Sequence, residues 1–320
     1  MGGYLVQIKV MQIKVQIKAQ LLSLAILFLC ARLAIAADWQ DPAIYEQAAV
    51  RDLVAMVNDA AQLVEQQGQA AFTELGKPGS RWLKNDRYLF IYDTDGRCLF
   101  HPMQPAHVGK NLIDFEDVLG RPVLRWLVGI GLDQAQSAGW VHYFSPPPNA
   151  LLPIWKSTYA VAVTTPEGER LVLASGLYNI RPEVVFLTDL VDRAVVLIEQ
   201  QGKDAFTVLA DESSAYNLLG LYVYVISHSG ELVVDPAFPG GSTRHALTYR
   251  DAVGHDFVRD AMERLDEDSD GAAWVTYMWP EPGQSAPSKQ LLYARRAQLG
   301  DEVYLVGSDM AVSHPIWLRY

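Results

Sequence analysis

Hydrophobic residues near the start of the chain recur at intervals of three and four, which is the period of one face of an α-helix. The apolar positions that follow this spacing are Val50, Leu53, Val54, Val57, Ala61 and Val64. The same spacing returns more than a hundred residues later, at Val184, Leu187, Val191, Ala194, Val195 and Ile198. Both stretches predict a long amphipathic helix, and Gly68 and Gly202 fall near the expected helix ends.

An aromatic segment with the period of a β-strand follows each helix. Alternation places Tyr88, Phe90 and Tyr92 on one face of a strand. The turn 93–96 ends on Gly96, which supplies the positive φ that such a turn needs. Residues 222–226, followed by a turn at 227–230, repeat this arrangement.

The remaining segments predict one further helix and three closing strands in each half. We expect helices over 122–136 and 253–267. The expected closing strands are 140–145, 156–163 and 170–177 in the first half, and 273–279, 289–296 and 303–307 in the second. Strands that follow one another without alternating helices form an antiparallel sheet, so the predicted fold class is α+β with about five strands in each sheet.

The two halves are copies of one unit. Residues 65–75 and 199–209 share eight of eleven positions at an offset of 134, and Trp140-Val141 returns as Trp274-Val275 at that offset. A constant register over most of a unit indicates a tandem duplication. We therefore predict module one at 38–180 and module two at 181–320.

The first 37 residues have the order of a secretory signal peptide. An apolar run at 21–29 follows the basic residues Lys9, Lys14 and Lys18. Small residues then occupy the −3 and −1 positions of a predicted cleavage site before Ala37. We assign 1–37 to a signal peptide and expect a periplasmic or secreted protein. The alternative is an uncleaved helix that anchors the modules to the inner membrane.

Charge and cysteine content narrow the possible partners. The first 37 residues hold four of the 26 basic residues and none of the 37 acidic ones, so their removal takes the net charge from −11 to −15. Such a surface repels phosphate backbones, so we expect no nucleic-acid partner. Cys98 is the single cysteine beyond the signal peptide and forms no internal disulfide.

Residues 88–123 carry a combined motif: an aromatic strand, a D-x-D-G turn, a His-Pro, a Gly-Lys-Asn-Leu and an Asp-x-x-Gly. The motif resembles the Cache domain, an extracellular sensor module shaped like a PAS domain, and the resemblance covers nearly all of 41–180. Module two resembles the family less closely. His101 becomes Asp235 there, and Lys289 lies four residues before Tyr293 where three separate Lys156 from Tyr159. These departures put ligand binding in module two in doubt.

The resemblance implies a small pocket between sheet, helix and loops that takes carboxylates, amino acids or related metabolites. Lys156 offers an ammonium to a carboxylate, tyrosines offer hydroxyls, and His101 offers a titratable donor. The candidate ligand-binding residues are Tyr88, His101, Trp140, Tyr143, Lys156 and Tyr159.

Each candidate also has a structural interpretation. The aromatic residues can be core residues with satisfied polar tips, His101 can close a strand end, and Lys156 can be a solvated lysine on an edge strand. Asp114 and Asp117 can cap the following helix. Residues 266–271 hold the first half of a calcium loop, but Tyr277 stands where the loop needs Glu, which favours a solvated acidic turn.

No catalytic, metal-binding or cofactor-binding motif stands out, so we expect a binding protein without enzymatic activity. The expected function is an exported sensor for an organic acid or an amino acid. Its expected partner is a membrane receptor, a kinase or a transporter, and its long helices could pair two copies as a homodimer. An exported hydrolase is a distant alternative that lacks an identifiable nucleophile and base.

Overall fold

The computed structural model describes residues 38–84, 86–133, 136–148, 150–237, 245–280 and 284–312. The predicted signal peptide at 1–37 lies outside these residues, so its cleavage stays a prediction.

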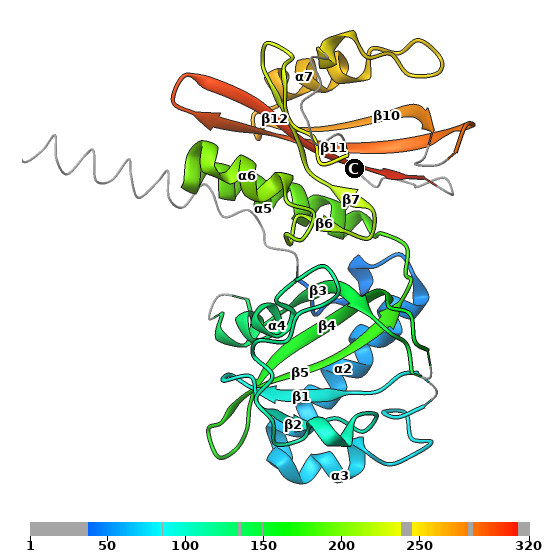
Figure 1. The fold of residues 1–320 in the computed structure, drawn as a ribbon, viewed down its shortest axis with the longest axis vertical. Helices are drawn as coiled ribbons and strands as arrows, with labels where there is room; N and C mark the ends of the chain where they lie inside the picture. The colour runs from blue at the N-terminus through cyan, green and yellow to red at the C-terminus, as the bar shows by residue number, and fades with distance from the viewer. Residues whose placement is uncertain are drawn as a thin grey trace, which may run out of the picture. The chain divides into compact units, whose positions relative to one another are not determined.

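The first sheet and its helices occupy residues 42–178 (Figure 1). Gln47 precedes a long helix in extended backbone, and Gly68 ends it with a positive φ. The elements in chain order are η1 (Pro42–Ile44), α2 (Ala48–Gln67), η2 (Gly68–Ala71), α3 (Phe72–Leu75), β1 (Phe90–Asp93), β2 (Cys98–Phe100), η3 (Pro105–His107), α4 (Val123–Leu132), β3 (Ala138–Ser145), β4 (Ile154–Thr164) and β5 (Arg170–Tyr178).

The second sheet and its helices occupy residues 184–311 and repeat this order (Figure 1). A short hairpin of two strands, β6 and β7, precedes the sheet and was not predicted from the sequence. The elements are α5 (Val184–Gln201), η4 (Gly202–Asp204), α6 (Ala205–Ala210), β6 (Asn217–Leu218), β7 (Leu221–Tyr222), β8 (Tyr224–Ser227), β9 (Leu232–Val234), η5 (Ala246–Thr248), α7 (Phe257–Glu267), β10 (Ala272–Pro280), β11 (Pro287–Leu299) and β12 (Glu302–Ala311).

The two five-stranded sheets have the same topology. The order in the first is β2-β1-β5-β4-β3, and the order in the second, read from the matching edge, is β9-β8-β12-β11-β10. All neighbouring strands in both sheets are antiparallel. These observations confirm the predicted α+β fold with a long helix before each sheet.

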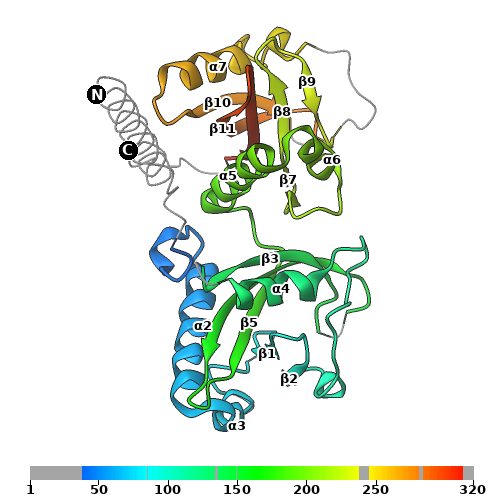
Figure 2. The same cartoon turned by 90° about the vertical axis from the view of Figure 1, so that its left-hand side faces the viewer.

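A helix covers each face of each sheet. In the first sheet α2 packs on β4 and β5 from one side, and α4 packs on β3, β4 and β5 from the other (Figure 2). Val123, Leu124 and Leu127 of α4 belong to one buried cluster with Val141 and Ala160 of the sheet. In the second sheet α5 and α7 take the two faces in the same way (Figure 2).

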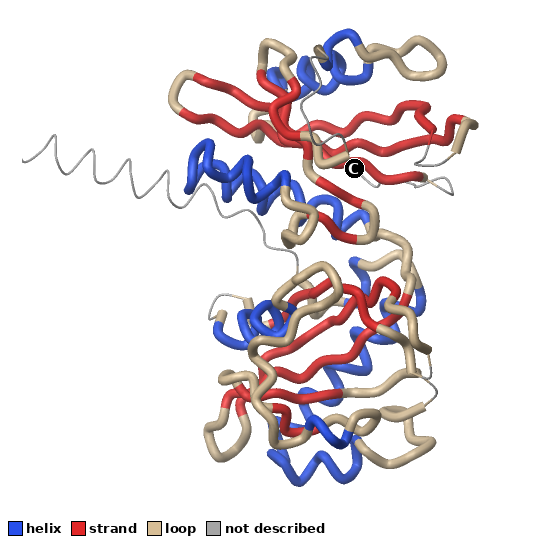
Figure 3. The backbone as a smooth tube through the Cα atoms, in the orientation of Figure 1, coloured by secondary structure: helices blue, strands red, loops and turns tan. Residues whose placement is uncertain are grey.

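Figure 3 shows which stretches of the backbone form helices and strands, and the bounds of these elements correct several predicted boundaries. The helix expected over 122–136 covers only Val123–Leu132, and the one expected over 253–267 begins at Phe257. The aromatic strand begins at Phe90 rather than at Tyr88. A tight turn around an aspartate precedes each of these helices, and in module two this turn delays the start of the helix to Phe257.

That aspartate is Asp117 in module one. Its Oδ1 accepts hydrogen bonds from the backbone N–H groups of Leu119 and Arg121, and its Oδ2 accepts one from Phe144 of β3. The predicted role as a helix cap is therefore wrong, since α4 has no side-chain cap. Asp117 instead fastens the turn before α4 to the sheet.

Asp251 makes the same three contacts in module two, with the backbone N–H groups of Val253, His255 and Met278. Every partner lies 134 residues after its counterpart. The duplication seen in the sequence therefore extends to individual hydrogen bonds.

Candidate functional site

A cavity of about 440 Å³ lies between the first sheet and α4. This volume falls in the range of pockets that hold small metabolites. Four predicted site residues line it: Tyr88, His101, Tyr143 and Lys156. The other lining residues are Phe90, Tyr92, Met103, Gln104, His107, Leu112, Phe115, Val123, Leu124, Leu127, Ser145, Pro146, Pro147, Pro148 and Ala150.

Lys156 is the cationic centre of this cavity. Only 3% of its surface is exposed, and its Nζ donates a hydrogen bond of 2.9 Å to the hydroxyl of Tyr88. The Nζ also lies 4.9 Å from the ring centre of Tyr88 and 5.2 Å from those of Phe90 and Tyr178. Aromatic faces attract a cation, but they do not replace its hydration shell. Burial consequently lowers the pKa of the Lys156 ammonium to about 7.

The backbone beside Lys156 is shaped to admit this side chain. Gly176 of β5 pairs with Thr158 of β4. A Cβ added at Gly176 would stand 2.8 Å from Cε of Lys156 and 2.7 Å from Oγ1 of Thr158, closer than real Cβ contacts. The glycine therefore leaves the space through which the lysine side chain reaches the cavity.

No aspartate or glutamate of the described ranges lines the cavity. Among the residues that the structure describes, Lys156 forms no salt bridge either. A buried cation without a counter-ion is costly, and an anionic ligand would offset this cost by balancing the charge of Lys156.

His101 adds a neutral donor. Its Nδ1 accepts a hydrogen bond of 3.0 Å from the backbone N–H of Gln104, which assigns the ring proton to Nε2. Burial, with a smaller contribution from Lys156, lowers the pKa of His101 to about 4. The imidazole therefore stays neutral at physiological pH. Its ring stacks on Phe90 at 5.5 Å.

Tyr143 offers a hydroxyl at the same place. Thr158 donates a hydrogen bond of 3.1 Å to the hydroxyl oxygen of Tyr143, so the phenolic proton is left to point at a ligand. Burial raises the pKa of Tyr143, and that of Tyr88, well above the ordinary value. Both phenols therefore remain protonated donors.

The structure places two predicted site residues, Trp140 and Tyr159, outside the described lining of this cavity, and their role in binding stays a prediction. They lie directly opposite each other on β3 and β4, whereas Tyr143 lies opposite Lys156. An odd separation along a strand turns side chains to opposite faces of the sheet. The Nε1 of Trp140 donates to the hydroxyl of Tyr45, and the hydroxyl of Tyr159 donates to Oδ1 of Asn58 on α2.

Sequence reasoning also missed residues that line the cavity. Phe90 and Tyr92 were placed on the face of Tyr88 by strand alternation but were not carried into the site. All three prolines of the run Pro146–Pro148 also line the cavity. Phe115 comes from a loop and His107 from the short helix η3, and no periodicity predicts the path of either segment.

The described part of the chain contains no group of three or more His, Cys, Asp or Glu side chains that could hold a metal ion. Its helices, within those same ranges, include none with the length and apolar content needed to cross a bilayer.

Comparison with family models identifies both modules. A model described as "Cache domain" matches residues 79–179, and a model described as "Single Cache domain 2" matches residues 198–311. Together the two ranges cover about two thirds of the chain.

The chain belongs to the Cache family.

Cache domains are sensor modules that are generally extracellular or periplasmic and typically non-enzymatic. The family assignment agrees with the resemblance seen in the sequence, and it includes module two despite the substitutions in that module's motif. No curated protein matches the chain significantly.

Several solved chemosensory domains are similar to this Cache protein. A periplasmic sensor domain of a chemotaxis protein has 23% identity and a TM-score of 0.34, covering 42% of this chain and 99% of its own. A Cache chemosensory domain described for carboxylic acid recognition has 26% identity and a TM-score of 0.34, with coverage of 41% and 93%. The ligand-binding domain of the Pseudomonas aeruginosa amino acid chemoreceptor PctB has 14% identity and a TM-score of 0.29, with coverage of 86% of each chain.

Proposed function

We propose that this Cache protein is an exported sensor whose module one binds a small molecule through a carboxylate placed against Lys156. The observation that carries this proposal is the buried Lys156 side chain in a cavity whose described lining contains no acidic residue.

The other polar groups of the cavity suit an anionic ligand. Lys156, the Nε2–H of His101 and the hydroxyl of Tyr143 are all donors, whereas a carboxylate has two oxygens that only accept. Charge-assisted hydrogen bonds to a carboxylate are about twice as strong as neutral ones, and they gain further where water is excluded. The apolar wall from α4, with Val123, Leu124 and Leu127, would hold the aliphatic part of the ligand.

Further parts of this proposal concern location and signalling. Residues 1–37 would act as a signal peptide or, if uncleaved, as an anchor, and modules at 38–180 and 181–320 would fold outside the cytoplasm. A sensor of this kind acts by passing ligand occupancy to a partner. We propose a membrane receptor, a kinase or a transporter for that role.

Titration calorimetry with matched pairs of ligands tests the proposal. Propanoate and propanamide have nearly the same shape but differ in charge, as do succinate and succinamide. We expect at least one carboxylate to bind saturably and its amide to produce no saturable heat, because the amide cannot balance the ammonium of Lys156. Binding at 100 times the dissociation constant would also stabilise the fold by about 2.7 kcal/mol. Equal binding of acid and amide, or no binding by any carboxylate, would contradict the proposal.

A further inference from the structure

The positions of module two that correspond to the cavity of module one have lost its basic side chains and gained carboxylates. Strand pairing places Lys156 opposite Tyr143 in module one and Gln290 opposite Tyr277 in module two. Gln290, and not Lys289, is therefore the counterpart of Lys156. Lys289 pairs with Met278 and is exposed. The buried cation of module one is thus replaced by a neutral amide.

A carboxylate enters from the neighbouring strand of the second sheet. Gly176 of β5 pairs with Thr158, and Asp309 of β12 pairs with Leu292, the residue that corresponds to Thr158. Asp309 therefore stands where module one leaves room for its lysine. His101 is likewise replaced, by Asp235 at the offset of 134. Both differences make this part of module two more negative than the corresponding part of module one.

Asp309 has only part of its hydrogen-bonding capacity filled. The hydroxyl of Tyr277 donates to its Oδ1 at 2.9 Å, while its Oδ2 accepts no hydrogen bond from any described residue. No basic side chain in the described ranges forms an ion pair with it. Burial, together with the nearby charge of Asp235, raises the pKa of Asp309 to about 6. Asp309 therefore resembles Lys156 with the opposite charge. It is a partly buried ionisable group without an ion-pair partner among the described residues.

The surroundings of Asp309 are aromatic. Tyr224 of β8 pairs with Gly307, two residues before Asp309 on β12, and its ring lies against this glycine, where an added Cβ would stand 2.8 Å from Cε2 of Tyr224. Tyr277 stacks on Phe257 of α7 with ring centres 4.0 Å apart, and Trp279 follows at 6.4 Å from Tyr277. Aromatic faces beside a carboxylate are the arrangement that recognises organic cations.

We propose that module two binds a cationic small molecule, an organic amine, with its ammonium group against Asp309 and its carbon atoms against the aromatic side chains of the α7 face. This site goes beyond the proposed function because it lies in the other module and selects the opposite charge. The competing explanation is that Asp309 serves only as a structural acceptor for Tyr277.

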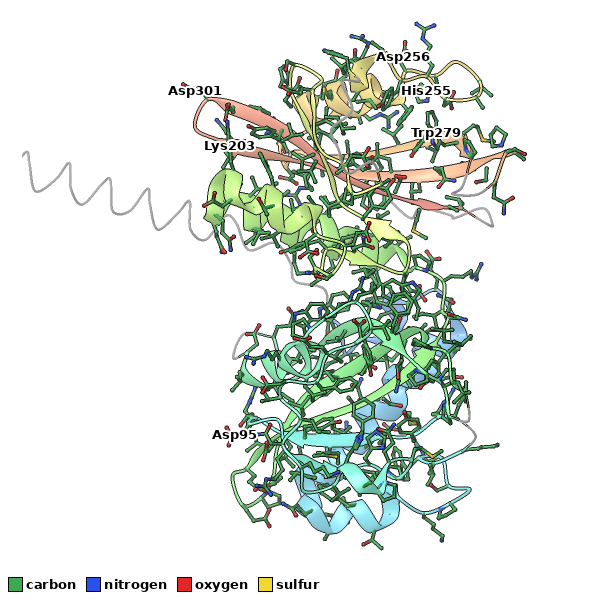
Figure 4. All side chains as sticks on the ribbon, in the orientation of Figure 1. Asp95, Lys203, His255, Asp256, Trp279 and Asp301 are labelled. Atoms are coloured by element: carbon green, nitrogen blue, oxygen red, sulfur yellow. The ribbon has the colours of Figure 1, made fainter. Side chains whose placement is uncertain are left out.

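Calorimetry at about pH 8, roughly two units above the pKa of Asp309, separates these explanations. The probes are ethylammonium, 1,4-diaminobutane and tetramethylammonium chlorides, with sodium chloride at equal ionic strength as the blank. The Asp309→Asn variant keeps an acceptor for Tyr277 and removes the charge. Asp301→Asn makes the same chemical change at the exposed turn between β11 and β12, at the opposite end of the sheet from Trp279 (Figure 4).

We expect saturable binding of at least one amine by the unmodified protein and by Asp301→Asn, with a loss of at least tenfold in affinity for Asp309→Asn. Lys156→Met should leave amine binding unchanged, so a failure of this proposal is distinct from a failure of the carboxylate site. Binding that Asp309→Asn retains would overturn the proposal, as would the absence of saturable binding by all three amines.

Discussion

Replacing Lys156 by methionine is expected to abolish carboxylate binding and, at the same time, to make the unliganded protein more stable. Methionine has a similar length and no charge, so it fills the same space without a desolvation cost. The pKa of Lys156 falls from 10.5 to about 7 on burial. A pKa difference of one between the folded and unfolded chain corresponds to about 1.36 kcal/mol, so the cost of burying the charge reaches about 5 kcal/mol as an upper bound.

The sign of this effect depends on pH in a defined way. Between about pH 7 and pH 10.5 the unfolded chain binds the lysine proton more strongly than the folded chain does. The penalty is therefore complete below pH 7 and disappears as the pH rises toward 10.5. Denaturant unfolding at about pH 7 should show the higher stability of Lys156→Met, and the difference should shrink at alkaline pH.

Lys77→Met provides the matched control for this variant, because Lys77 is exposed beyond α3 and does not line the cavity. It should change neither the stability nor the carboxylate affinity appreciably. A Lys156→Met protein that is less stable than the parent, or that still binds the carboxylate, would show that Lys156 is a structural residue.

The affinity for a carboxylate is expected to fall about tenfold per pH unit above pH 7, until the pKa of Lys156 in the complex is reached. The free ammonium loses its proton at about pH 7, whereas a bound carboxylate raises the pKa of Lys156 and keeps it charged. Binding in this range is therefore coupled to proton uptake. His101, with a pKa of about 4, stays neutral over the same range and contributes nothing to the slope.

Calorimetry from about pH 6 to pH 9 in buffers of different protonation enthalpy measures both quantities. The predicted result is constant affinity below pH 7, falling affinity above it, and an uptake that approaches one proton per ligand. An affinity independent of pH across this range would mean that the carboxylate of the ligand does not contact Lys156.

Much of the fold could be predicted because it depends on local periodicity. The spacing from Val50 to Val64 produces α2, and the alternation from Tyr88 to Tyr92 fixes the face on which three cavity residues lie. The offset of 134 between the copies anticipated the second sheet. The late start of α7 was not predicted because the turn before it depends on a long-range hydrogen bond to β10, which leaves no local pattern.

The predicted site combines residues an odd number of positions apart along a strand, so its members are divided between the two faces of the sheet. Trp140 with Tyr143, and Lys156 with Tyr159, satisfy the family motif but cannot share one face of a strand. Alternation could have excluded one member of each pair, although it does not say which face carries the cavity. The sequence comparison also did not reveal Asp309, the residue of module two that corresponds to Gly176. The offset between the copies changes from 134 to 133 in the last strand, so the constant offset does not align the two residues.

The central claim, that a carboxylate binds against Lys156 in module one, is tested most directly by a crystal structure of the complex. The carboxylate that binds best in calorimetry would be co-crystallised with the protein. We predict that its oxygens lie about 2.7–2.9 Å from Nζ of Lys156, with its aliphatic part toward α4. A ligand bound elsewhere on the protein, or one whose carboxylate points away from Lys156, would contradict the account.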